Sequence, residues 1–494
     1  MSTTRPNAEA DVSPPAPLEI ASSTWDSGRI ELTDGAPTED WGVAAAPTSG
    51  GPYPVVIVLH GNHPTCPTDI GEGRSWPCPP GTEFANHEGL RYLVDALAER
   101  GFVAIAPGIN VQYTLGAGEP LSAVRTAEIA AHALAALKAG QLDIDPGLID
   151  SERLVMIGHS VGGQDAALIA AGDTSFHEPV DGLIMLQPAL NDQRALPLAN
   201  VPSVVVVSEC DGDTGVVGGR YVTEALLTGR EHPAAVVVLE GANHNFTNTL
   251  LAPDRFPVLA PRCDTDQALE STTQQTLLAD VVPELAHAVL ADGQGTGWAG
   301  ALMTTPSPAA PDGIQIGVVP SDEPIASLPG PGPVTPAIDL NAMTATFCPA
   351  GYYTPFMKPG TEVCHRPELP LFVGLPQTIA LSWNASAASI TLPLDAPAGH
   401  TIILRVVPDV ADPNLTGETL QLRLSTPEGD ETEIAVPIPD HVREEIPPFT
   451  LTHALVMWST VELPAPNGAS AITIEVRSPT RGSIQLLSLG ARPN

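Results

Sequence analysis

The first residue that could do chemistry lies in the segment 158–162, which has the sequence GHSVG. Its Gly-x-Ser-x-Gly spacing follows a short apolar run over 154–157 and precedes a helical apolar pattern over 164–171. A serine between a strand and a helix lies at a sharp turn with no room for flanking side chains, hence the glycines. The helix N-terminus also favours developing negative charge. We predict that Ser160 is a nucleophile; a structural serine in a tight turn is the alternative.

A serine hydroxyl is a weak nucleophile at neutral pH and needs a base that is held by an acid. His244 follows the apolar run 236–239, in a loop at the carboxyl end of a predicted strand, where α/β sheets place their chemistry. A surface or capping histidine is the alternative interpretation. The run 204–207 leads into a loop with two candidate acids, Asp211 and Asp213. We favour Asp211, four residues after the strand's last valine, and keep Asp213 as the alternative acid.

Acyl transfer also needs two backbone N–H donors where negative charge develops on the substrate oxygen. The amide of Val161, directly after the nucleophile, is the first. The second is expected in the loop after the apolar run 55–59, and we choose Asn62 in the sequence His60-Gly61-Asn62. The other histidines that we considered as bases are weaker candidates, because they fall in predicted helices, in this loop or in the turn itself: His60, His63, His132, His159 and His287.

Alternating elements must position these residues. Between 51 and 291, short apolar runs typical of buried strands alternate with segments of helical spacing, which predicts an α/β fold with a doubly wound, mostly parallel sheet. Residues 1–50 are predicted to form a tail with lead-in strands. Residues 292–340 are rich in Pro, Gly, Ser and Ala, which indicates a linker. Short β-like runs over 341–494 predict an all-β sandwich of jelly-roll or immunoglobulin-like kind.

The composition fits a folded protein that avoids anionic partners. Of 494 residues, 43% are hydrophobic, which is enough for a sizeable core. There are 57 acidic and 21 basic residues, and a formal net charge of −36 repels nucleic acid and anionic membranes. No apolar run reaches the roughly 18 residues of a transmembrane helix. We therefore expect no nucleic-acid partner and no transmembrane segment, and we expect a monomer.

Six cysteines fall into pairs that are close in sequence. The predicted pairs, one of the connectivities that six cysteines allow, are Cys66 with Cys78, Cys210 with Cys263, and Cys348 with Cys364. Their spacing does not match metal-binding patterns, so we predict no metal. Disulfides would indicate an oxidising compartment; six buried free thiols in a cytosolic protein are the alternative. No signal peptide is visible, so we expect a secreted protein whose signal is absent from this sequence.

Four segments together resemble the α/β-hydrolase superfamily: VVIVLHGN, GHSVGG, ECDGD and GANHNF. The order Ser160, Asp211, His244 along the chain is that of the superfamily's template. Within it, residues from about 50 to 290 are similar to secreted actinobacterial lipase/cutinase-like and platelet-activating-factor-acetylhydrolase-like esterases. The resemblance implies hydrolysis of carboxylic esters through an acyl-enzyme, without a cofactor. A long loop over 64–80 and the large C-terminal β domain depart from compact cutinases.

The substrate expected from this reading is lipid-like or a polyester, polymeric or surface-bound, because no connection between the nucleophile and His244 is long enough for a large helical lid. Trp76, Tyr113 and Gln164 are the candidate substrate-binding residues, with a packing role as the alternative for Trp76. Two other functions remain open: an acyltransferase that uses the same acyl-enzyme but excludes water, and a non-catalytic surface-binding protein.

Overall fold

The structure is a computed structural model of the chain. It describes the following residues: 16–67, 76–118, 120–190, 198–215, 218–219, 221–222, 230–254, 268–290, 297–304, 309–319, 343–348, 378–383, 387–408, 420–436, 459–477 and 482–493.

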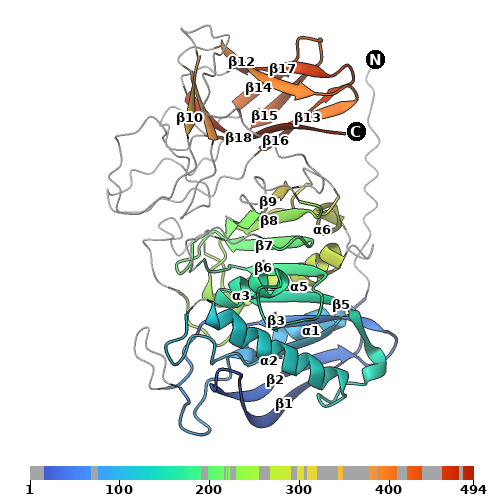
Figure 1. The fold of residues 1–494 in the computed structure, drawn as a ribbon, viewed down its shortest axis with the longest axis vertical. Helices are drawn as coiled ribbons and strands as arrows, with labels where there is room; N and C mark the ends of the chain where they lie inside the picture. Colours follow the sequence, from blue (N-terminus) through green and yellow to red (C-terminus); the bar gives the residue numbers. More distant parts are fainter. Residues whose placement is uncertain are drawn as a thin grey trace.

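An α/β domain contains a nine-stranded sheet in the order β1-β2-β4-β3-β5-β6-β7-β8-β9 (Figure 1). Its six central strands run parallel: β3 (Tyr53–Leu59), β4 (Val103–Pro107), β5 (Ile149–His159), β6 (Gly182–Leu186), β7 (Ser203–Ser208) and β8 (Ala234–Leu239). Three antiparallel strands lie outside them: β1 (Ile20–Glu31), β2 (Pro37–Pro47) and β9 (Ile314–Val319). All six carboxyl ends of the parallel strands therefore meet at one edge, where the sequence places its candidate residues.

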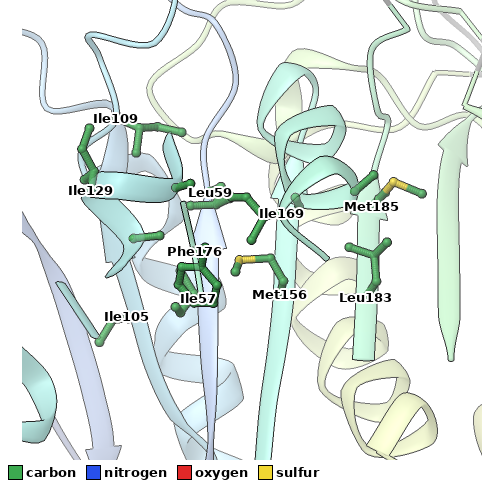
Figure 2. Close-up of a cluster of buried hydrophobic side chains, with 14 of the residues drawn as sticks. Ile57, Leu59, Ile105, Ile109, Ile129, Met156, Ile169, Phe176, Leu183 and Met185 are labelled. Carbon is green, nitrogen blue, oxygen red and sulfur yellow. The ribbon is translucent and has the colours of Figure 1, made fainter. Parts of the chain in front are cut away.

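Helices cover both faces of this sheet (Figure 1). One face packs on α2 (Leu121–Lys138) and α3 (Val161–Ala170), and the other on α1 (Arg91–Glu99) and α5 (Ser271–Leu290). Figure 2 shows part of the first layer, with Ile57, Met156 and Leu183 on three neighbouring strands and Ile129 and Ile169 on helices of the same layer. Shorter helical elements are η1 (Asn86–Leu90), η2 (Pro146–Leu148), η3 (Asn245–Thr247) and α6 (Gly297–Ala301). Burial on both faces explains why the central strands are continuous apolar runs.

A β-sandwich follows the α/β domain. Its five-stranded sheet has the order β10-β11-β18-β13-β16 and its four-stranded sheet the order β12-β17-β14-β15, with every pair antiparallel. The strands are β10 (Met343–Cys348), β11 (Thr378–Trp383), β12 (Ala387–Ala396), β13 (His400–Pro408), β14 (Leu420–Ser425), β15 (Glu431–Val436), β16 (Ser459–Ala465), β17 (Ala469–Arg477) and β18 (Gly482–Pro493). Alternate residues of the two sheets form one aliphatic core, as expected when one face of each sheet is buried.

The predicted α/β domain followed by a β-sandwich is thus confirmed, with two differences in detail. Ile314–Val319, predicted as part of a linker, forms β9 and pairs with β8 over its whole length. Pairing satisfies the backbone groups of the β8 edge and buries Ile314 and Val318. Met343–Cys348 forms β10, a strand that we did not predict. Residues 222–228, whose sequence pattern predicts a helix, lie almost entirely outside the described residues.

None of the helices in the described part of the chain is both long and apolar enough to cross a bilayer.

Candidate active site

Ser160 lies at the turn between β5 and α3, with φ 56° and ψ −125°. A positive φ is unusual for a residue with a side chain and persists only where the surroundings enforce it. The surroundings here are tight, because a Cβ on Gly158 would collide with the backbone of Gly162, and a Cβ on Gly162 would collide with the carbonyl of His60. The two glycines of the motif are therefore required by close backbone packing.

The turn is also held by hydrogen bonds. The amide of Ser160 donates to the carbonyl of Leu186, at the end of β6, over 2.9 Å. Its carbonyl accepts from the amides of Gly163 and Gln164, in the first turn of α3. Val161 is the first residue of that helix, so its amide is one of the four that have no carbonyl within the helix. This is the position expected of an oxyanion donor.

Asp211 lies in the loop after β7, and its carboxylate is completely buried. Oδ1 accepts from the amides of Asp213, Thr214 and Gly215 at 2.7 to 2.9 Å. Oδ2 accepts from the Thr214 hydroxyl at 2.9 Å and lies 2.7 Å from Nδ1 of His244. The loop thus folds around the carboxylate and leaves one oxygen directed at the imidazole.

The alternative acid, Asp213, takes a different position. Its Oδ2 lies 3.7 Å from Nε2 of His244, and its side chain is 55% exposed. Nε2 is the nitrogen that would exchange a proton with Ser160, so a carboxylate there cannot orient the base as a triad acid does. Of the two candidate acids, Asp211 is therefore the one placed to orient the imidazole through Nδ1.

His244 is buried and held from two sides. Its Nδ1 contacts Asp211, and its carbonyl lies 3.2 Å from Nε2 of His159, the residue before Ser160. The rings of His159 and His244 are 4.7 Å apart between centroids. Nε2 of His244 has no hydrogen-bond partner among the described residues. The imidazole is thus oriented on one side by a carboxylate and left open on the other, beside the segment that carries Ser160.

The charges around His244 favour its protonated form. Burial by itself disfavours the imidazolium, but the attraction of Asp211, with Asp213 and Asp254, outweighs burial and raises the pKa of His244 to about 9. Burial has the opposite result for His159, which has no carboxylate beside it, and holds its pKa well below the usual value. The carboxyl of Asp254 has a raised pKa because of burial and the nearby charge of Asp211.

The loop after β3 brings Gly61 against the nucleophile. A Cβ added to Gly61 would lie 2.7 Å from Cβ of Ser160 and 3.0 Å from the ring of His63, so only glycine fits. Asn62, the predicted second oxyanion donor, is the next residue. The structure thus brings Asn62, Val161 and Ser160 into one region of the sheet edge.

Buried asparagines connect this loop with the loop of the base. Nδ2 of Asn86 donates to Oδ1 of Asn110 and to the carbonyl of Pro64, both over 2.9 Å. Nδ2 of Asn248, four residues after His244, donates to the carbonyl of Asn86 over 2.9 Å. These hydrogen bonds connect the loops that follow β3, β4 and β8, which fixes the loops relative to one another.

One predicted disulfide, Cys66–Cys78, is confirmed, with an S–S distance of 1.94 Å. Cys210, beside Asp211, is also disulfide-bonded. Its predicted partner Cys263 lies outside the described residues. The predicted pair Cys348–Cys364 is not described, because Cys364 and the side chain of Cys348 lie outside them.

The three predicted substrate-binding residues differ in how far they are exposed. Trp76 is 8% exposed, belongs to the hydrophobic core and donates from Nε1 to the carbonyl of Pro37 over 2.6 Å, which fits the packing alternative. Its role in substrate binding stays a prediction. Gln164 is completely buried in α3, and its role in substrate binding also stays a prediction. Tyr113 is partly exposed in the loop after β4 and stays a prediction.

Other residues of the site were not singled out from the sequence. Thr214 contacts both Asp211 and Nδ1 of His244. Gln274 of α5 exchanges two 2.7 Å hydrogen bonds with the backbone of Asn243. Gln187, with φ 42°, connects Ser208 to Thr247. Only Thr214 had a local signal, its place three residues after the acid. In the described ranges, no three His, Cys, Asp or Glu side chains converge as metal ligands would.

A scan of the chain against protein-family models found no matching model. A search among curated proteins likewise found no match.

Proposed function

We propose that this protein is a serine hydrolase of carboxylic esters, built on an α/β-hydrolase fold. The observation that carries the proposal is the buried Asp211–His244 pair, 2.7 Å apart, in loops packed against a serine at positive φ. An acid, a base and a serine at the ends of separate parallel strands are the groups that acyl transfer needs. A purely structural role would not require a buried imidazole with an open Nε2 at this place.

In this mechanism, Nε2 of His244 removes the proton from the Ser160 hydroxyl as the oxygen attacks the ester carbonyl carbon. The tetrahedral oxyanion is stabilised by the amides of Val161 and Asn62. Asp211 stabilises the imidazolium, which then gives its proton to the leaving alcohol. Water repeats the sequence on the acyl-enzyme: His244 takes a proton from it, and the Ser160 oxygen leaves with that proton.

We propose an apolar ester, lipid-like or polymeric, as the substrate class. Four large apolar side chains are exposed among the described residues, and three of them lie on loops at the catalytic edge: Phe84, Leu115 and Leu250. These loops follow the carboxyl ends of β3, β4 and β8. Because exposed apolar side chains are costly in water, their grouping on these loops supports contact with an apolar surface. The disulfides support secretion as the setting.

The test is an ester panel, from p-nitrophenyl butyrate to a polyester film, with wild type and Ser160→Ala. We expect ester hydrolysis by wild type and a loss of about 10⁶-fold in kcat in the variant, as for other triad serines. Adding an alcohol acceptor in water separates the alternatives: an ester product identifies an acyltransferase. Equal activity of wild type and variant would refute the proposal, and failure on the film alone would remove the polymer class.

A further inference from the structure

One carbonyl in the loop after β3 is held by two buried side chains. The carbonyl oxygen of Gly61 lies 2.8 Å from Nδ1 of His60 and accepts from Nε2 of Gln112, also over 2.8 Å. His60 is completely buried, and Gln112 is 1% exposed. Two donors on one carbonyl fix the orientation of the whole peptide group, because that group is planar.

The hydrogen bonds also define the tautomer of His60. The amide of Ile109 donates to Nε2 over 2.9 Å, so Nε2 is an acceptor and the proton of the neutral ring lies on Nδ1. Burial lowers the pKa of His60 to about 3, which keeps the ring neutral over the working range of an esterase. Nδ1 therefore donates permanently to Gly61.

The hydrogen bond from Gln112 to Gly61 leaves the other polar atom of the Gln112 amide without a partner among the described residues. Its Oε1 has no hydrogen-bond partner in the part of the chain that the structure describes. A buried amide with half of its polar groups unpaired destabilises a fold, and an apolar side chain of similar size would avoid that cost. The hydrogen bond to Gly61 is then the reason to expect an amide here.

The held peptide is the one that carries the amide of Asn62. The Gly61–Asn62 bond is not among the cis peptides, and in a trans peptide the N–H points opposite to the C=O. Gly61 lies against Ser160, so the N–H of this peptide belongs to the nucleophile's surroundings. Hydrogen bonds that hold the Gly61 carbonyl therefore also fix the direction of the Asn62 N–H.

We propose that His60 and Gln112 are positioning residues of the oxyanion hole, which hold the Gly61 carbonyl so that the Asn62 amide is aimed at the tetrahedral oxygen. The assignment rests on the proposed serine-hydrolase function. Loss of a complete oxyanion donor lowers kcat by about 100- to 1,000-fold. A donor that is retained but less well oriented should lower it less, roughly tenfold for each holding residue.

The test compares kcat, KM and melting temperature for p-nitrophenyl butyrate in three variants. Gln112→Met removes the amide and keeps the size; we expect kcat to fall roughly tenfold, with KM unchanged and the melting temperature unchanged or higher. His60→Leu should lower kcat as much or more. His60→Asn should restore most of this loss, because its Nδ2 takes the place of Nδ1 as a donor. Gln315→Met, which removes an amide from β9, is the control and should match wild type.

The outcomes distinguish the inference from the function on which it rests. A wild type no more active than Ser160→Ala would overturn the proposed function and this assignment with it. With an active wild type, kcat within twofold of wild type in Gln112→Met would overturn the assignment alone. So would a loss of kcat in that variant that only follows a lower melting temperature, and so would equal losses in His60→Leu and His60→Asn.

Discussion

Polar side chains are buried in different ways in the two parts of the molecule. The described residues of the β-sandwich contain four buried polar side chains, Thr401, Arg405, Thr426 and Ser488, around an aliphatic core. The edge of the α/β sheet at which the parallel strands end contains a series of buried histidines instead. Neighbouring rings in this series are 6.0, 5.5 and 4.7 Å apart, in the order His60, His63, His159, His244.

This difference supports placing the proposed chemistry in the α/β domain. Burying a polar group costs free energy unless a partner compensates. The sandwich buries one arginine, Arg405, but it places charges such as Arg477 and Glu433 on its surface, where their 3.3 Å ion pair adds little. The α/β loops accept the cost at His244, Asp211 and Gln112, which we attribute to the proposed reaction.

The largest effect on activity is expected from Asp211→Asn, which changes one of the buried polar groups at the sheet edge. The amide still accepts hydrogen bonds from the loop, but it no longer stabilises the imidazolium and favours the wrong tautomer of His244. We expect kcat to fall by about 10⁴-fold, with a normally folded protein, measured with p-nitrophenyl butyrate and by circular dichroism. Asp213→Asn is the matched control and should lose far less at its optimum pH. Equal losses in the two variants would contradict the assignment of the acid.

Substitutions that create a cavity in each hydrophobic core can separate effects on stability from effects on catalysis. Leu404 of β13 and Leu183 of β6 are both completely buried in hydrophobic clusters. Each Leu→Ala substitution should lower the free energy of unfolding by about 2–5 kcal/mol, measured by chemical denaturation. We expect Leu404→Ala to keep wild-type kcat at 25 °C. A loss of kcat in this variant, at full folded fraction, would show that the sandwich takes part in the chemistry.

Removing the Cys66–Cys78 disulfide should affect both stability and activity within the α/β domain. Cys66–Cys78 links residues 12 apart, in the loop that begins with the Gly61–Asn62 peptide. Replacing both cysteines by serine should lower the free energy of unfolding by roughly 3 kcal/mol, because the unfolded chain gains freedom. Activity should fall as well, since the loop also carries Asn62. Denaturation and steady-state kinetics measure the two effects, and unchanged values of both would contradict a structural role for this bond.

Much of the fold and of the site was predictable because its signals are local. Continuous apolar runs identify buried strands, and the glycines around Ser160 identify the turn. The place of His244 after β8 and the distance of Asp211 from its strand predicted two side chains that the structure brings within 2.7 Å of each other. Each of these inferences needs only a strand, its end and the residues that follow.

The rest depends on contacts between distant segments. The exposure of Trp76 is decided by Pro37, 39 residues earlier, and by the core around it. Gln112 meets Gly61 across 51 residues, and β9 is recognised as a strand only by the free edge of β8 that it covers. No local pattern in the sequence carries these pairings, because each is fixed only when the sheet has formed.

The smallest expected effect concerns pH and the second aspartate. His244 must be neutral to act as a base, and its pKa of about 9 means that activity rises as pH rises through that value. Asp213 contributes to the raised pKa, with Oδ2 3.7 Å from Nε2. Asp213→Asn removes this charge, so the pKa should fall and the rising limb of kcat/KM should move toward neutral pH. Activity at pH 7 should therefore increase.

Asp254→Asn provides the comparison for this shift. Its carboxylate also raises the pKa of His244, but it accepts from the backbone amides of Gly212 and Asn245, so its removal disturbs the loop as well. In Asp213→Asn, we expect the rising limb of kcat/KM to move while the plateau rate at high pH stays that of wild type. This result would show that Asp213 acts on His244 through its charge alone. A lower plateau in Asp213→Asn would instead show that this carboxylate helps to orient the base, which would blur the distinction between the two aspartates.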